Sequence, residues 1–281
     1  MAVVGTYVAL SKPLTAAMPV LLLAWLRFAI AAIVMLPWTL PGSLRSEPIS
    51  PQNWRALFLQ SLFGNFLFSI FMLNGVSMTS ASAAGVILAM LPAAVALLSW
   101  LFLRERLSGR GWSAVGLAIL GVSILSLGRP GTSAATQGSL TGDLLVLACV
   151  FCEAIYVVIG KRLTATLSAM RISALINLFG LVLMTPFGLW QARTFDFGTL
   201  TTGLWVMLVF YAIAASTLST WLWLSGLKHV PASHSGVFTI AMPLAASAVA
   251  VGFLGEQFTM LHGVALGCAA AGVALISRTR R

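Results

Sequence analysis

The chain has 281 residues, of which 59% are hydrophobic and 8% are charged, and its formal net charge is +10. So few polar side chains cannot cover the surface of a water-soluble protein, whereas the hydrocarbon core of a bilayer accepts apolar ones. Composition therefore excludes a soluble enzyme or binding module, and it leaves no soluble basic domain that could bind nucleic acid.

Ten apolar segments follow one another along the chain, and a membrane span needs about 20 such residues. The first, residues 1–10, is too short, so we expect either a half-length helix or a start that lies upstream. Lys12-Pro13 is expected to end it. The other predicted helices cover residues 20–40, 54–73, 82–103, 111–127, 143–160, 172–190, 200–227, 233–254 and 261–277. The fold class that this predicts is an all-α polytopic membrane protein with ten transmembrane helices.

Two of the segments, 82–105 and 233–256, are built alike. Each has a proline near its middle and a glutamate at its end, and the offset between the copies is 151 residues for Pro92 and Pro243 and again for Glu105 and Glu256. The first two helices of each half align at an offset of 149. These constant offsets indicate an internal duplication.

The duplication predicts a first five-helix repeat at 1–127, a Gly/Ser/Thr-rich flexible connector at 128–142, a second repeat at 143–277 and a basic tail at 278–281. Because five is an odd number, the second repeat must enter the membrane from the opposite side. The sequence therefore predicts inverted repeats.

The basic residues predict how the chain is oriented. With both termini inside, twelve of the 16 Lys and Arg residues fall in the inner loops and tail, while the outer side holds only Lys12, Arg129 and Arg193. Cytoplasmic loops are enriched in Lys and Arg. We therefore expect a multi-pass protein of the cell membrane with both termini in the cytoplasm.

Residues 73–125 read LNGVSMTSASAAGVILAMLPAAVALLSWLFLRERLSGRGWSAVGLAILGVSIL. They resemble the EamA-type transporters of the drug/metabolite transporter superfamily. The shared marks are a polar turn into the fourth helix, a mid-helix proline, and a helix-ending glutamate followed three residues later by Ser or Thr. Glu105…Ser108 and Glu256…Thr259 show the last mark twice. The resemblance implies two inverted five-helix repeats, a central cavity and alternating access, commonly for export of amino acids or other metabolites.

Pro92 and Pro243 each remove a helical hydrogen bond and are expected to kink their helices. Such kinks are tolerated in membrane helices, but matched kinks in inverted repeats are typical of a transporter's hinge and binding site. Glu105 and Glu256 end helices, where the macrodipole disfavours an anion. Two interpretations stay open for them, a structural staple at the helical hairpin and a gate ion pair.

Glu153 is the carboxylate that lies well inside a predicted span, and Tyr156 shares its helix face. A charge at this depth should face the bundle interior and be paired or protonated. Its alternatives are proton coupling, a contact with a substrate amine, and a structural pair with Arg27. The alternative for Arg27 is a bidentate contact with a substrate carboxylate.

Further candidates for a substrate cavity are polar or aromatic residues within predicted spans, each of which a hydrogen bond between helices would also explain. They are Gln60, Asn65, Asn74, Tyr211, Trp221 and Thr239. Together they suggest a neutral cavity lined by aromatic rings and hydroxyls, which suits a zwitterion or a small amphipathic solute.

The leading hypothesis is a secondary transporter of small metabolites that acts without ATP, since the sequence has no Walker-type phosphate loop. We expect no cofactor and no metal, because Cys149, Cys152 and Cys268 lie in apolar runs without the spacing of a zinc site. No two acidic residues meet within a span, which argues against a membrane-embedded transferase. An uptake carrier, a drug or amine exporter and a passive channel remain alternatives, as do a monomer and a homodimer.

Overall fold

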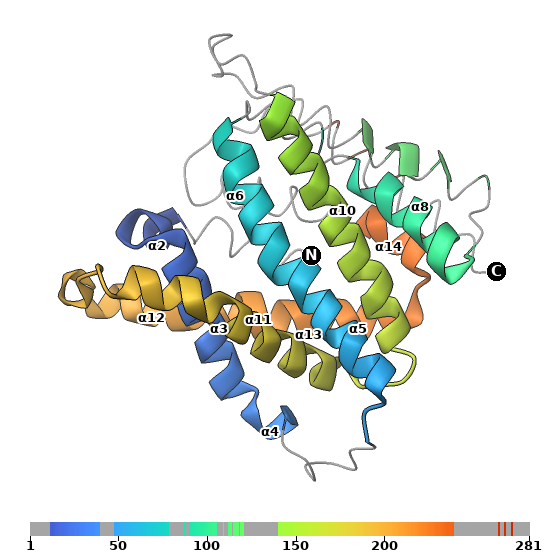
Figure 1. Ribbon diagram of the computed structural model, residues 1–281. Helices are drawn as coiled ribbons and strands as arrows, with labels where there is room; N and C mark the ends of the chain where they lie inside the picture. The colour runs from blue at the N-terminus through green and yellow to red at the C-terminus, as the bar shows by residue number, and fades with distance from the viewer. Residues whose placement is uncertain are drawn as a thin grey trace.

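A computed structural model describes residues 12–39, 48–78, 90–105 and 140–238, together with positions 87, 109, 112–113, 115–117, 119–120, 264, 267 and 271. Every regular element in these residues is a helix (Figure 1). Within the described part of the chain, four helical stretches are long and apolar enough to cross a membrane, namely Pro51–Met72, Leu140–Leu163, Ala169–Ala192 and Thr202–His229. The predicted all-α membrane fold is confirmed for the described residues. The first predicted segment, part of the fourth helix and most of the fifth, ninth and tenth lie outside them.

The chain begins its described part with α2 (Lys12–Ala17), α3 (Val20–Val34) and α4 (Leu36–Thr39). Lys12 and Pro13, which are predicted to end the first apolar segment, both lie within α2, and that segment itself falls outside the described residues. The predicted helix 20–40 is interrupted at Met35 (φ −95°, ψ 5°). Pro37 explains the interruption, since it has no N–H to continue the helical ladder.

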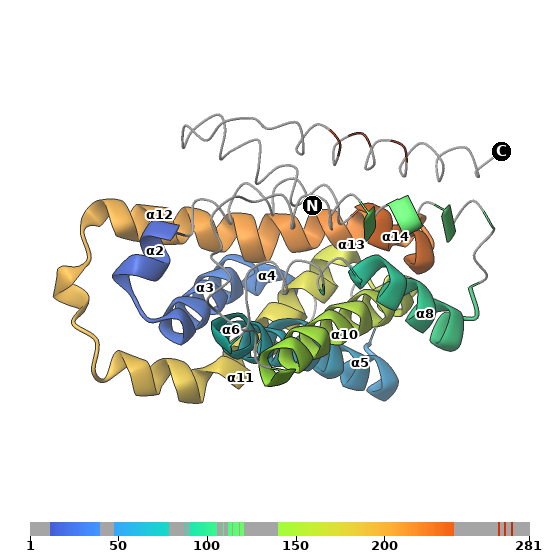
Figure 2. The ribbon, with the colours of Figure 1, turned by 90° about the horizontal axis from the view of Figure 1, so that it is seen from above.

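Two long rods share one internal pattern. The first consists of α5 (Pro51–Ser61), the π-helical segment η1 (Leu62–Leu67) and α6 (Phe68–Met78). The second consists of α12 (Thr202–Ala212), the π-helical segment η3 (Ile213–Leu218) and α13 (Ser219–His229), and Figure 2 shows it as one continuous helix. Every boundary of the second rod repeats that of the first at the offset of 151, as do the two N-cap residues, Ser50 and Thr201.

The remaining elements are α8 (Leu91–Leu103), α10 (Leu140–Leu163), α11 (Ala169–Ala192), the short 3₁₀ turn η2 (Phe197–Thr199) and α14 (Ala232–Phe238). α10 begins at Leu140, inside the predicted connector 128–142. The connector is therefore shorter at its C-terminal end than predicted, and residues 128–139 lie outside the described part.

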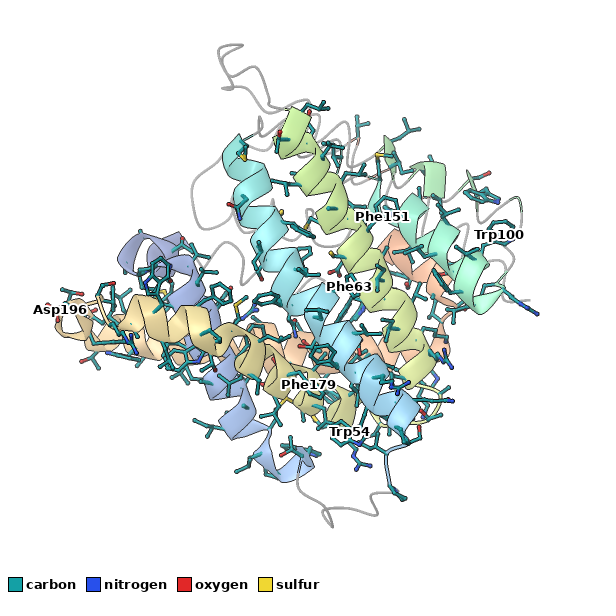
Figure 3. All side chains as sticks on the ribbon, in the orientation of Figure 1. Trp54, Phe63, Trp100, Phe151, Phe179 and Asp196 are labelled. Carbon is teal, nitrogen blue, oxygen red and sulfur yellow. The ribbon has the colours of Figure 1, made fainter. Side chains whose placement is uncertain are left out.

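α10 packs along the whole first rod, and α8 and α14 pack against each other beside it (Figure 1). The buried core of this part joins side chains of α5, α8, α10, α11 and α13. At the edge of that core, Trp54 of α5 meets Phe179 of α11 edge to face, with ring centroids 6.1 Å apart (Figure 3). By contrast, Trp100 of α8 is 57% exposed, as a side chain in contact with lipid would be.

α3 and α11 are equivalent helices of the two halves, and they pack against each other in opposite directions. The backbone N–H of Leu22 donates to Oε1 of Gln191 (2.8 Å), and Nε1 of Trp25 donates to Oγ1 of Thr185 (3.1 Å). Residue numbers rise along one helix as they fall along the other. Gln191 thereby satisfies an N-terminal amide of α3, whose N-cap, Pro19, makes no side-chain cap hydrogen bond.

The two rods also run in opposite directions relative to α11. In the first rod, Asn53 contacts Thr166 and Ser61 contacts Ile176, so residue numbers rise together. The second rod follows α11 through a short connection and folds back along it. Asn177 in the first half of α11 therefore meets Ser216 in the second half of this rod, as the two arms of a helical hairpin do.

Candidate functional site

The centre of α11 is hydrogen-bonded to both π-helical segments. On one side, the amide of Asn65 in η1 donates to the backbone oxygen of Ile176 (3.2 Å), and the hydroxyl of Ser61 donates to the same oxygen (2.8 Å). On the other side, the amide of Asn177 donates to the backbone oxygen of Ser216 in η3 (2.9 Å). Positions 65 and 216 are equivalent by the duplication. Consecutive residues of α11 therefore contact the same position in both π segments, an element that is frequent at functional sites.

Nearby hydroxyls satisfy backbone oxygens within the two π segments. Ser69 donates to the oxygen of Asn65 (2.6 Å), and Ser219 donates to that of Ala214 (2.7 Å). Such side-chain bonds compensate for carbonyls that the widened turn leaves unpaired. One backbone oxygen in each π segment is therefore paired with a nearby hydroxyl.

Several buried polar atoms around this centre have no hydrogen-bond partner within the described part of the chain. They are Oγ of Ser216, Oγ1 of Thr217, Oε1 of Gln60 and Nε of Arg27. Buried polar groups in proteins are almost always paired, so each such atom needs an explanation. A polar ligand that enters the bundle would provide one.

Arg27 reaches this centre from α3. Its guanidinium carbon lies 4.5 Å from the centroid of the Phe28 ring, within the range of a cation–π contact. The Phe28 ring packs against Gly180 of α11, and the amide nitrogen of Asn65 lies against the same glycine. Arg27 therefore carries its charge at the level of η1. It forms no ion pair with Glu153 among the residues that the structure describes.

Glu153 and Tyr156 lie on the face of α10 that packs against the first rod. The Tyr156 ring sits directly on Gly64 of η1, where a Cβ would collide with the ring. One turn before Glu153 along this face, Sγ of Cys149 approaches the backbone oxygen of Phe68 (3.8 Å). Because Glu153 stands between Cys149 and Tyr156 on the same helix face, its side chain is directed toward η1.

Gln60 is fully buried at the next turn of the same interface. Its Nε2 donates to the backbone oxygen of Tyr156 (3.3 Å), and it lies against Gly160. The structure thus brings Gln60, Glu153 and Tyr156 together along the seam between α10 and the first rod. Asn65 of the same rod faces α11 instead.

Three other predicted cavity residues lie apart from this centre. Asn74 is exposed and donates to the backbone oxygen of Ile70 in its own helix (2.7 Å). Trp221 is 37% exposed. Tyr211 packs at the edge of a separate apolar cluster with Leu23 and Leu208. The remaining candidate, Thr239, lies outside the described residues.

Pro92 is buried at the second position of α8. The residue that precedes the helix, Met90, has φ −77° and ψ −8°, and its N–H donates to the oxygen of Ile87 (3.0 Å). The described helix thus begins immediately before the proline, where the sequence predicts a kink. Its predicted counterpart, Pro243, falls outside the described residues.

Glu105 follows α8, and its carboxylate accepts the backbone N–H groups of Ala232 (3.1 Å) and Ser233 (2.9 Å). These are the first residues of α14. The contact therefore joins the end of the fourth predicted helix to the start of the ninth. The staple proposed from the sequence would instead hold together the fourth helix and the helix that follows it. The predicted role of Glu256 falls on a residue outside the described part.

Ser61 and Asn177, which make the central hydrogen bonds, were not predicted from the sequence. The contacts of Lys161 were not predicted either. Asn177 is an amide within an apolar run, the same signal that singled out Asn65. It could have been found. The partners of Ser61 and Lys161 are backbone oxygens of other helices, for which the sequence holds no signal.

Comparisons with known proteins agree with this architecture. The model of the EamA-like transporter family matches residues 1–127 and 140–278. The uncharacterized transporter YetK of Bacillus subtilis is 33% identical over 273 residues, which cover 97% of this chain and 83% of YetK. An uncharacterized transporter of Archaeoglobus fulgidus is 25% identical over 258 residues, covering 92% of this chain and 88% of the relative. One solved crystal structure matches all of this chain and 96% of its own with a TM-score of 0.78 at 18% identity, which shows a shared fold.

Proposed function

Because the chain belongs to the EamA-like transporter family, we propose that this membrane transporter moves small metabolites by alternating access around a central cavity, without ATP. Export of amino acids or related neutral or zwitterionic solutes fits it best. The proposal includes ten helices in two inverted repeats, placed in the cell membrane with both termini in the cytoplasm.

One observation carries the mechanism: adjacent residues of α11, Ile176 and Asn177, contact the same position of two rods that run in opposite directions. In many secondary transporters, the substrate site lies near the bilayer midplane, where two inverted repeats meet. Asn65 and Ser216, which the duplication makes equivalent, both contact α11 at the same height along its axis. A solute held at this level could be reached from either side as the halves rock.

The unpartnered groups support a zwitterionic solute. Arg27 offers a buried guanidinium nitrogen and Ser216 a buried hydroxyl, both of which suit a carboxylate. Glu153 of α10 suits an amine. Within the described residues Arg27 and Glu153 form no ion pair with each other, which is consistent with each of them binding one end of a zwitterion.

Counterflow in proteoliposomes tests the proposal. Vesicles loaded with an unlabelled solute should accumulate the labelled one transiently, with saturation, for at least one member of a panel of amino acids, purines and cationic drugs. Arg27→Gln should lose counterflow of carboxylate-bearing solutes, and Arg27→Lys should retain part of it. Stimulation by amines alone would favour an amine exporter. Flux without saturation or counterflow would identify a passive channel and overturn the carrier mechanism.

A further inference from the structure

The turn between α13 and α14 is held from both sides by charged side chains of other elements. Lys161, in the last turn of α10, donates from Nζ to the backbone oxygens of Leu227 (2.8 Å) and Lys228 (3.1 Å), at the end of α13. Glu105, just after α8, accepts the N–H groups of Ala232 (3.1 Å) and Ser233 (2.9 Å), at the start of α14. Four hydrogen bonds thus fasten one short turn.

Each charge meets the helix end of opposite polarity. The C-terminal carbonyls of α13 carry the negative end of its dipole and receive an ammonium, whereas the N-terminal amides of α14 carry the positive end and receive a carboxylate. Bonds with one ionised partner are roughly twice as strong as neutral ones. Both side chains are partly buried, so water competes for them less than at an open surface.

The backbone before Glu105 is shaped for this contact. Arg104 adopts a left-handed conformation (φ 54°), the only positive φ at a non-glycine residue among those described. The N–H groups of Arg104 and Glu105 both return to the oxygen of Ser99 (3.3 Å for Glu105), so the backbone folds back over the last turn of α8. A bulky residue held in this conformation is costly. The backbone conformation that directs Glu105 toward α14 is therefore kept although Arg104 itself disfavours it.

We infer that Glu105 and Lys161 form a latch that holds this end of the bundle closed and must release for it to open. The inference rests on the proposed alternating access. α8 packs against α14, and α10 contacts both α13 and α14. Separating α8 from α14 breaks the carboxylate bonds, and separating α10 from α13 breaks the ammonium bonds. The latch predicts that opening at this end involves at least one of these separations.

A buried reporter cysteine tests the latch. Ser235 lies on α14 next to the turn and is 2% exposed. In a background with Cys149, Cys152 and Cys268 replaced by alanine, Ser235→Cys is treated with a small water-soluble thiol reagent in detergent, where both ends of the bundle are accessible. Glu105→Ala should raise the labelling rate at least about tenfold, since hydrogen bonds to charged groups contribute about one to two powers of ten each. Lys161→Met should also raise it, and Glu105→Gln should raise it less.

Two controls separate local opening from unfolding. Ser173→Cys reports on α11, where the Ser173 hydroxyl contacts Sδ of Met35 (3.6 Å), and the residue is fully buried. Its labelling should stay slow in every latch variant. The matched variant Glu256→Ala makes the same chemical change at the equivalent position of the second repeat and should not accelerate labelling at Ser235→Cys.

Three results would overturn the latch: unchanged labelling in both Glu105→Ala and Lys161→Met, equal acceleration at Ser235→Cys and Ser173→Cys, or equal acceleration by Glu256→Ala. Counterflow is measured separately on the unlabelled parent protein. Absent counterflow with accelerated labelling would remove the proposed function but leave the latch as an opening of the bundle. Normal counterflow with unchanged labelling would remove the latch alone.

Discussion

The two rods, α5–η1–α6 and α12–η3–α13, share their boundaries, their type of N-cap and the place of their π-helical segment, yet their inward side chains differ. The N-caps Ser50 and Thr201 both accept an N–H three residues later, at 3.3 Å and 3.4 Å. At the centre, however, Asn65 of the first rod corresponds to Ser216 of the second. The duplicated backbone geometry is retained, and the asymmetry that a substrate would meet resides in the side chains.

The sharpest difference lies at Gly64, whose counterpart in the second rod is Ala215. Only the first rod admits an aromatic ring against its backbone, because Tyr156 occupies the space of the missing Cβ. Two predictions test this contrast between the rods, and a third tests a similar contrast between the two halves at the end of α8.

The largest effect is expected from exchanging these two residues. Gly64→Ala drives a Cβ into the Tyr156 ring and should lower the free energy of unfolding by about 1–3 kcal/mol, the usual cost of overpacking. Ala215→Gly should cost about 0.5–1 kcal/mol through backbone entropy. Thermal unfolding midpoints in detergent measure both. A greater loss of stability in Ala215→Gly than in Gly64→Ala would contradict the proposed tight contact between Gly64 and Tyr156.

A smaller effect is expected at the two amides that reach across α11. Asn177 makes bonds of 2.7 Å and 2.9 Å, and its side chain is buried. Asn65 makes longer bonds, of 3.3 Å and 3.2 Å. Asn177→Leu should therefore cost about 1 kcal/mol, and Asn65→Leu about 0.5 kcal/mol. The same unfolding assay compares the two variants. A larger loss of stability in Asn65→Leu than in Asn177→Leu would contradict the view that the bond from Asn177 to η3 contributes more.

An effect of similar size but opposite sign is expected at the end of α8, where Arg104 is left-handed. This conformation costs a non-glycine residue about 1–2 kcal/mol, whereas glycine adds chain entropy that costs about 0.5–1 kcal/mol. Arg104→Gly should therefore raise the free energy of unfolding by about 0.5–1 kcal/mol. The second half already has glycine at the matched position, Gly255, so Gly255→Ala should destabilise. Thermal midpoints measure both, and destabilisation by Arg104→Gly would contradict this account of the helix end.

Much of the fold could be predicted from the sequence because the apolar segments and the offsets of 149 and 151 are unusually regular. The predicted helix 200–227 corresponds to the rod Thr202–His229, and 172–190 corresponds to α11. The break at Met35 and the extension of α10 to Leu140 were missed, because they depend on single residues at helix ends. The π segments have no signature in residue type.

The candidate site was predictable only in part. Buried amides and charges stand out in an apolar sequence, which is why Arg27, Gln60 and Asn65 were among the predicted residues, and their role in a substrate cavity stays a prediction. Depth along a helix does not fix the direction of a side chain, and so Asn74 and Trp221 lie on the surface. The contacts of Glu105 cross between halves and end on backbone N–H groups, which residue identity does not reveal.

The central claim, that equivalent ends of the two rods face opposite sides of the membrane, is tested most directly by a matched cysteine pair. Gln52 and Gly203 are equivalent positions, and both are exposed at the start of their rods. In a cysteine-free background, an impermeant thiol reagent applied to intact cells should label Gly203→Cys and leave Gln52→Cys unlabelled until the cells are permeabilised. Labelling of both in intact cells, or of neither, would contradict the opposed arrangement.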